Sequence, residues 1–348
     1  MNAEGLLGTF DFRTMESFLE RAFPQNSISF GQLVVEMMSG GTEFDVSLLW
    51  KEFLNALLYG ISDSKKMFFT LFVLGLVSVI LYNAAGMFKE KQTMQIANYF
   101  VTMLGAIALI QGFEIAFHIC QSCVELVMDF IRIFLPVYCL SLGFVKGAMT
   151  AYGYYQFVFV VLYLLQQILI HVFLPLTKCF ILLTFMNGLV EDKRFEGIQK
   201  LIEKGIGTGL KCMTYLVVGT GMFRTLLTVR VDHLNKTVLQ KAVAAIPAVG
   251  DVTDSATQMI LSCGSLVQGG LGSAALIVLV LICLTPLVKL LFLYGSLQVS
   301  SSLIGLLGEK NMTKTTAEAS KAFLFLFQIA FFTLLMFMLI IGLMMYQM

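Results

Sequence analysis

Long apolar stretches dominate the pattern of hydrophobic and polar positions along this chain of 348 residues. A helix needs roughly 20 apolar residues to cross a hydrocarbon layer of about 30 Å. Three stretches meet this requirement clearly: 67–88, 270–295 and 322–346. The first of them is bounded by lysines on both sides, as is common where a helix meets a membrane surface.

The middle of the chain predicts further crossings. The segments 96–117, 124–145 and 206–228 are each long enough for one span. The run 153–187 is too long for a single untilted span, and Pro175 is expected to divide it into a full span and a shorter segment. We therefore predict an all-α, polytopic membrane protein with about six to eight spans.

The first 62 residues have a different, amphipathic pattern. In 45–61 the apolar side chains recur at helical spacing, and Trp50 is among them. Such a helix lies in the membrane interface with Trp50 at headgroup depth, or packs on the extramembrane surface of the protein itself. A shorter version spans 11–23 and stops at Pro24. The opening residues do not have the pattern of a signal peptide.

These patterns divide the chain into four regions. We expect an N-terminal amphipathic region over 1–62, a first transmembrane group over 63–190, an amphipathic loop over 191–204 and a C-terminal transmembrane group over 205–348. Which side of the membrane carries the 191–204 loop stays open, because its basic residues are accompanied by four acidic ones.

Composition supports a bilayer environment. Hydrophobic residues make up 58% of the chain and charged residues 13%, about half of the ~25% that is usual in soluble domains. The net charge of +1 gives no field that would attract nucleic acid, and none is expected as a partner. The seven cysteines lie in or beside apolar stretches, and we interpret them as packing residues between helices.

Motifs of enzymes and cofactor sites are missing from the sequence, so no catalytic residue, cofactor or metal is predicted. His118, Cys120 and Cys123 are close enough in sequence to bind a metal, but on a helix they do not share one narrow face. Gly205, Gly207 and Gly209 follow no strand, so they favour close helix packing over a nucleotide loop.

A helical hairpin is predicted over 235–268, where Pro247 and Gly250 interrupt the helical pattern and Asp251 and Asp254 follow. The hairpin either re-enters the membrane and lines a cavity or lies on the membrane surface as a helix-turn-helix. In both cases we favour a structural role for the two aspartates over a role as proton carriers, with Asp254 capping the next helix.

Three further residues within predicted spans are candidate pore or hinge positions. Lys211 lies one turn into its span, and Lys289 lies close enough to a span end to reach the headgroups, although intramembrane lysines are often functional. Pro286 predicts a kink. If the protein conducts, a wet path should contact Gln166, Gln167, Lys211, Asp251 and Asp254.

Several features, in order, resemble the stage III sporulation protein AE family of endospore-forming bacteria. They are Asn187-Gly188-Leu189 after a long apolar stretch, the amphipathic segment Phe195–Lys204, the Gly-rich span with Lys211, the approach from Lys241 through Pro247 to Gly250, and the polar link 309–321 before the last span. The sequence departs from the family pattern at Thr253-Asp254-Ser255, where members have Ser-Asp-Ala.

The resemblance implies a non-enzymatic component of a trans-envelope channel complex in the mother-cell membrane around the forespore. Its expected partners are a secretion-type ATPase, ring-forming proteins and a forespore-side protein, besides the lipid bilayer. The alternative is a secondary transporter or solo permease for a small solute, which would have paired broken helices near the midplane. Only one broken helix is predicted here, at Pro247.

Overall fold

The computed structural model describes the backbone of residues 12–22, 29–38, 91–146, 148–189, 194–243, 250–306 and 310–345, with isolated positions between 65 and 80. Side chains are described over a smaller part, which leaves out 142–155 and 220–265. The described part is helical and contains no strand, as the sequence predicts.

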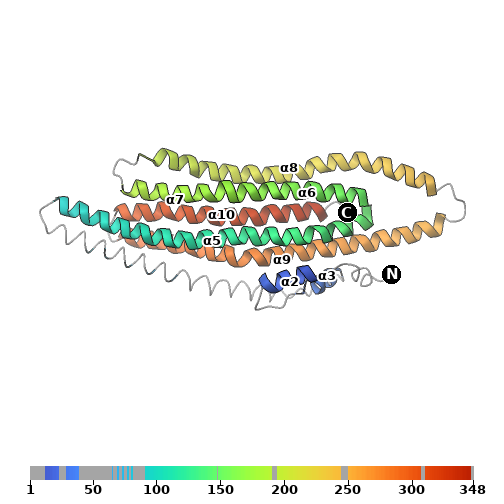
Figure 1. Ribbon diagram of the computed structural model, residues 1–348, viewed down its shortest axis with the longest axis horizontal. Helices are drawn as coiled ribbons and strands as arrows, with labels where there is room; N and C mark the ends of the chain where they lie inside the picture. The colour runs from blue at the N-terminus through green and yellow to red at the C-terminus, as the bar shows by residue number, and fades with distance from the viewer. Residues whose placement is uncertain are drawn as a thin grey trace.

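Long helices form an elongated bundle in which neighbours run side by side along one axis (Figure 1). The helix α10 packs against α9, α5, α7 and α8, while the short helices α2 and α3 pack against α5 and α9. The elements are α2 (Arg13–Ala22), α3 (Phe30–Met38), α5 (Lys91–Lys146), α6 (Ala148–Ile168), the π-helical segment η1 (Leu169–Phe173), α7 (Leu174–Leu189), α8 (Glu196–Val243), α9 (Gly250–Leu306) and α10 (Lys310–Met345).

Three helical segments of the described part are long and apolar enough to cross a membrane: Gln156–Gly188, Leu266–Gly305 and Thr313–Gly342. They fit an integral membrane protein, but the predicted six to eight spans are not confirmed. The predicted span 67–88 lies outside the described residues, apart from isolated positions. The longest helices, α5 with 56 residues and α9 with 57, measure about 85 Å, which exceeds the thickness of a bilayer.

The prediction of two separate spans at 96–117 and 124–145 is wrong, because α5 is one continuous helix over both. The polar residues between the two segments include no proline or glycine, so they lower the hydropathy without ending the helix. Pro136 also lies inside α5. The chain reverses direction at the end of α5, and α6 returns along it (Figure 1).

The expected break at Pro175 is also absent. The run continues from α6 through η1 into α7, and Pro175 is the second residue of α7. The π-helical segment ends two residues before the proline, and the backbone N–H of Leu174 bonds to the carbonyl of Leu169. Such segments insert a residue into a helix without ending it, so the proline is accommodated within one rod.

The N-terminal helices are part of the packed structure. Met15, Phe18 and Leu19 of α2 are buried, and the ring of Phe18 lies 6.0 Å from that of Phe130 of α5. The amphipathic pattern at 11–23 is therefore explained by packing on the protein. The predicted interfacial helix 45–61, including Trp50, lies outside the described residues.

Glycine allows α3 to approach α9. A Cβ atom at Gly270 would lie 2.5 Å from Met38 Cγ and 3.2 Å from the backbone carbonyl oxygen of Val34. The first contact is with a flexible side chain, but the second is with backbone, which cannot move without shifting α3. The close packing of α3 on α9 therefore depends on this glycine.

The predicted hairpin 235–268 corresponds to the end of α8 and the beginning of α9. The helix α8 ends at Val243 and α9 begins at Gly250, and Pro247 lies between them, outside the described residues. Asp254 lies in the second turn of α9 and not at its N-cap position. Its capping role is therefore not supported by the helix boundary.

Candidate functional site

Three segments far apart in the sequence meet at one end of the bundle. Asn187 lies near the end of α7, Gln199 in the first turn of α8, and Glu318 near the beginning of α10. A network of hydrogen bonds joins their side chains. We call this group, together with Thr184, Glu203 and Lys321, the polar junction.

Gln199 is the centre of the polar junction and is buried, with 6% of its surface exposed. Its carbonyl oxygen accepts a hydrogen bond from Asn187 Nδ2 at 2.8 Å. Its amide nitrogen donates to Thr184 Oγ1 at 3.0 Å and lies 3.5 Å from Glu318 Oε2. Asn187 Oδ1 in turn accepts the backbone N–H of Phe195 at 3.1 Å, which fixes the chain just before α8 begins. Burial of these amides is tolerated because each one has partners.

An ion-pair cluster borders the polar junction on the side of α10. Lys321 Nζ lies 3.0 Å from Glu318 Oε2 and 3.5 Å from Glu203 Oε2 of α8. The three side chains are each about one-third to two-fifths exposed. Because Lys321 contacts carboxylates from two helices, it links α8 to α10 electrostatically.

Close contact between the backbone of α7 and a side chain of α10 completes the junction. A Cβ atom at Gly188 would lie 2.6 Å from Thr315 Oγ1 and 3.1 Å from its Cγ2. Asn187-Gly188 therefore combines a side chain that orders α8 with a position that must stay small against α10. Both residues belong to the motif that carries the family resemblance.

The chemistry of the polar junction is that of a structural joint. It contains amides, a hydroxyl group, two carboxylates and one ammonium group, and it contains no thiol or histidine. In the part of the chain that the structure describes, no group of three or more His, Cys, Asp or Glu side chains could hold a metal ion. The arrangement fixes the direction in which α8 leaves α7.

The outer face of the same segment is apolar and exposed. Ile198 is 52% and Leu201 72% exposed, and they flank Lys200, whose Nζ lies 2.9 Å from Glu196 Oε1. The amphipathic segment predicted at 191–204 therefore turns Gln199 inward and leaves apolar side chains without cover from the described residues.

The candidate residues from the sequence lie elsewhere. Lys211 is exposed on α8, and Lys289 and Pro286 are partly buried in α9, whose helix continues through the proline. Gly250, Asp251 and Asp254 form the start of α9, but their side chains are not described. Pro247 and Trp50 are outside the described residues. None of the described candidates belongs to the polar junction.

The glycine and cysteine predictions have mixed outcomes. A Cβ atom at Gly209 would lie 2.7 Å from Phe173 Cζ, so this glycine does allow close packing of α8 against η1. A Cβ atom added at Gly205 or Gly207 would meet open space, so neither glycine is required for close packing. Buried cysteines on facing helices pack as predicted, with Cys123 Sγ and Cys283 Sγ 3.9 Å apart, whereas Cys179 and Cys212 are exposed.

The structure separates the three residues that could have formed a metal site. Cys120 and Cys123 point into the core, and Cys120 Sγ lies 3.3 Å from the carbonyl oxygen of Leu326 in α10. The side chain of His118 is 68% exposed on another face and lies 3.4 Å from Glu114. They therefore do not converge, as their helical spacing predicts.

Comparison with known proteins identifies relatives of the whole bundle. The family described as Stage III sporulation protein AE matches residues 28–347, which include every described helix after α2. Stage III sporulation protein AE of Bacillus subtilis (strain 168) is 19% identical over 307 residues, which cover 88% of this chain and 77% of that protein. No solved structure matches. The chain belongs to the stage III sporulation protein AE family.

Proposed function

We propose that this protein is a non-enzymatic integral membrane component of a secretion-like channel complex that links mother cell and forespore and maintains the forespore. The observation that carries the proposal is the family match over residues 28–347, which extends along almost the whole helical bundle. The three long apolar helices support a place in a membrane, and the proposal locates them in the mother-cell membrane around the forespore.

Within this proposal, the polar junction presents a docking surface. Its hydrogen bonds hold the first turns of α8 in a defined direction, so that Ile198 and Leu201 face outward on a rigid helix. Apolar side chains on a fixed helical face are typical anchors for another protein. The proposed partners are other members of the complex: a secretion-type ATPase, ring-forming proteins and a forespore-side protein.

Deletion of the gene in its native host tests the function. Microscopy of the deletion strain should show forespores that are engulfed and then shrink. The intact gene should restore normal forespores. Normal numbers of heat-resistant spores, in a host without a second copy, would refute the proposal.

A pair of matched variants tests the docking surface. The double variant Ile198→Ser with Leu201→Ser should lower the yield of heat-resistant spores while the protein remains at its normal level in the membrane. Tyr215→Ser is the control, because Tyr215 is 73% exposed further along α8 and lies outside the proposed surface. Equal spore yields from the double variant and the control would exclude this surface as a docking site.

The aspartates at the start of α9 have their own test. Asp251→Asn and Asp254→Asn keep the size of the side chains and remove their charge. If these charges contribute to a conducting path or to assembly, sporulation falls. Unaltered sporulation would remove both residues from the functional set.

A further inference from the structure

The exposed side of α5 changes character along the helix. Before Glu114, the exposed side chains are mainly apolar and include Met103, Leu104, Ile107 and Ile110. Between Glu114 and Arg132 the outward positions are mainly polar, with Ile115 as an exception, and polar side chains recur three or four residues apart in one stripe: Glu114, His118, Gln121, Ser122, Glu125, Asp129 and Arg132. We call these residues the polar stripe. At 1.5 Å per residue it is about 27 Å long, close to the thickness of a hydrocarbon core.

The N-terminal end of the polar stripe, around Glu114, interacts with α7. Glu114 Oε1 lies 3.4 Å from His118 Nε2 and 4.0 Å from Lys178 Nζ of α7. The side chains of these three residues nevertheless remain between 44% and 68% exposed. In the middle of the stripe, Gln121 Nε2 donates to Glu125 Oε1 at 2.9 Å, a contact within α5 that leaves the outer face open.

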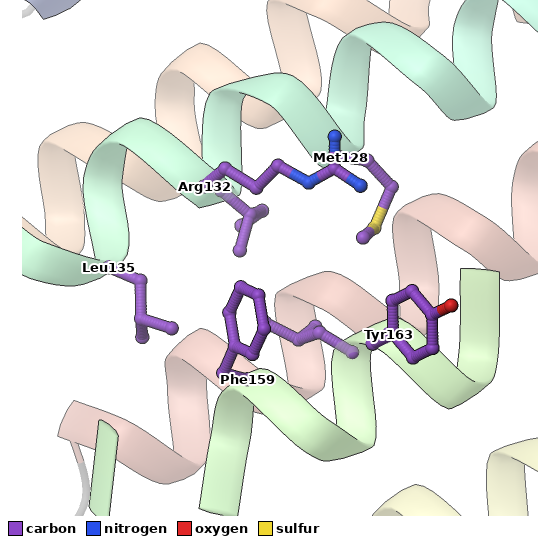
Figure 2. A pocket seen from close by; sticks show the side chains of 7 residues that line it. Met128, Arg132, Leu135, Phe159 and Tyr163 are labelled. Carbon is purple, nitrogen blue, oxygen red and sulfur yellow. The ribbon is translucent and has the colours of Figure 1, made fainter. Parts of the chain in front are cut away.

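The C-terminal end of the polar stripe, around Arg132, interacts with α6. Arg132 Nη1 lies 3.4 Å from Asp129 Oδ1, and its Nη2 donates to Gln166 Oε1 at 2.9 Å. Beside the guanidinium group there is a small pocket between α5 and α6, where Phe159 and Tyr163 face Arg132 (Figure 2). The side chain of Arg132 is still 47% exposed, so α6 covers only one flank of the stripe.

Four contacts place the polar stripe level with the middle of the apolar helices. Its two ends touch Lys178 and Gln166, which are equally far from the two ends of the apolar segment Gln156–Gly188. At its middle, Cys123 contacts Cys283 near the centre of Leu266–Gly305. Cys120, one turn away, contacts Leu326 near the centre of Thr313–Gly342.

At this depth the outer face of α6, η1 and α7 is mainly apolar, with His171 as an exception. Its exposed side chains include Val160, Leu164, Val172 and Leu182. Lipid can surround such a face, but it cannot surround a row of half-exposed carboxylates and a guanidinium group at low cost. Charged side chains at membrane depth face water or other protein.

We propose that the polar stripe of α5 lines a water-filled path across the membrane. Three acidic groups and the nearby Arg132 and Lys178 give the path mixed charge, which suits small hydrated solutes with little selection for one sign. This inference goes beyond the proposed sporulation role, because it depends on the membrane placement of the apolar helices and not on the partners of the complex. It assigns the wet face to α5, and Gln166, one of the polar positions expected from the sequence, contacts this face.

Accessibility of single cysteines to a charged reagent tests the inference in membranes that contain the full chain. The exposed Cys179 and Cys212, and Cys263, are first replaced by Ser. Ser122→Cys and Glu125→Cys then report on the polar stripe, and Ser122→Cys exchanges side chains of nearly equal size. Leu164→Cys and Val172→Cys are the controls, because both positions are about half exposed on the apolar face at the same depth. The probe is a membrane-impermeant, positively charged methanethiosulfonate.

Thiols ionise and react in water but not in hydrocarbon, so the polar stripe cysteines should react at least about tenfold faster than the two controls. Equal rates at all four positions in intact membranes, with full reaction of every variant after denaturation, would overturn the inference. A normal spore yield from a gene deletion would refute the sporulation role and leave this result unchanged, so the two failures can be told apart.

Discussion

Replacement of Gln199 by Leu tests whether the polar junction stabilises the bundle. Leucine is apolar and similar in volume, so the substitution removes every side-chain hydrogen bond that Gln199 makes, while the backbone bond to Phe195 stays. Thr184 keeps a partner, because its hydroxyl also donates to the carbonyl oxygen of Phe180 at 2.9 Å. Glu318 keeps its contact with Lys321. The group left without a partner is therefore the side-chain N–H of Asn187, which bonded to Gln199 at 2.8 Å.

The expected loss of stability follows from this one unpaired side-chain N–H group of Asn187. An unsatisfied buried donor costs about 1–3 kcal/mol, and the lower half of that range applies because Asn187 is only partly buried. For a chain of this size we take about 2 °C of melting temperature per kcal/mol, so Gln199→Leu should melt about 2–4 °C lower.

Thermal unfolding in detergent, followed with a fluorogenic maleimide at one heating rate, measures this shift. The buried thiols of Cys120, Cys123, Cys139 and Cys283 supply the signal, and replacement of the exposed Cys179 and Cys212, and of Cys263, by Ser lowers the background. The signal therefore reports the opening of the contacts among α5, α9 and α10.

Lys200→Leu is the matched control for Gln199→Leu. Lys200 is the next residue in α8, its side chain is 71% exposed, and it forms an exposed ion pair with Glu196, so its loss should shift the melting temperature by less than about 1 °C. Equal melting temperatures for the two variants would show that the reasoning from the orphaned amide is wrong.

Two further predictions concern the packing of α9. Mild oxidation should form a disulfide between Cys123 and Cys283, whose sulfurs are 3.9 Å apart. After cleavage at a protease site placed between α5 and α9, the linked fragments should run as a single band on a non-reducing gel. Two separate fragments would contradict this helix pairing. Gly270→Ala should lower the melting temperature by about 2–4 °C, since its Cβ atom meets the backbone of Val34. Gly295→Ala in the same helix has open space and should leave stability equal or higher, so a similar loss in both variants would refute the packing argument.

The sequence predicted the helical membrane class and the family, because apolar length and the order of motifs are local features. It did not predict where the chain reverses. Residues 118–123 are polar enough to suggest a loop, yet without glycine or proline they stay helical, and a π-helical segment accommodates Pro175. Hydropathy alone does not distinguish a polar turn from a polar helical face.

The candidate sites, too, could be predicted from the sequence only in part. The family resemblance points to Asn187 and Gly188. It does not point to the contact of Gln199, the partner of Asn187, with Glu318, because 119 residues separate Gln199 from Glu318 and no periodic pattern links them. The polar stripe of α5 did have a signal, since its residues recur every three or four positions. Division of 96–145 into two predicted spans hides this pattern, because the stripe crosses the boundary between them.

The contact of α3 with α9 has a consequence for biosynthesis. The chain from Met38 to Gly270 must be made before these helices can meet, and at about 5–20 residues per second this takes roughly 10–50 s. During that interval the buried side chains Phe30, Leu33 and Val34 have no helix α9 to cover them. The N-terminal helices therefore complete their packing late in translation, and a chaperone or the membrane surface would have to shelter them first.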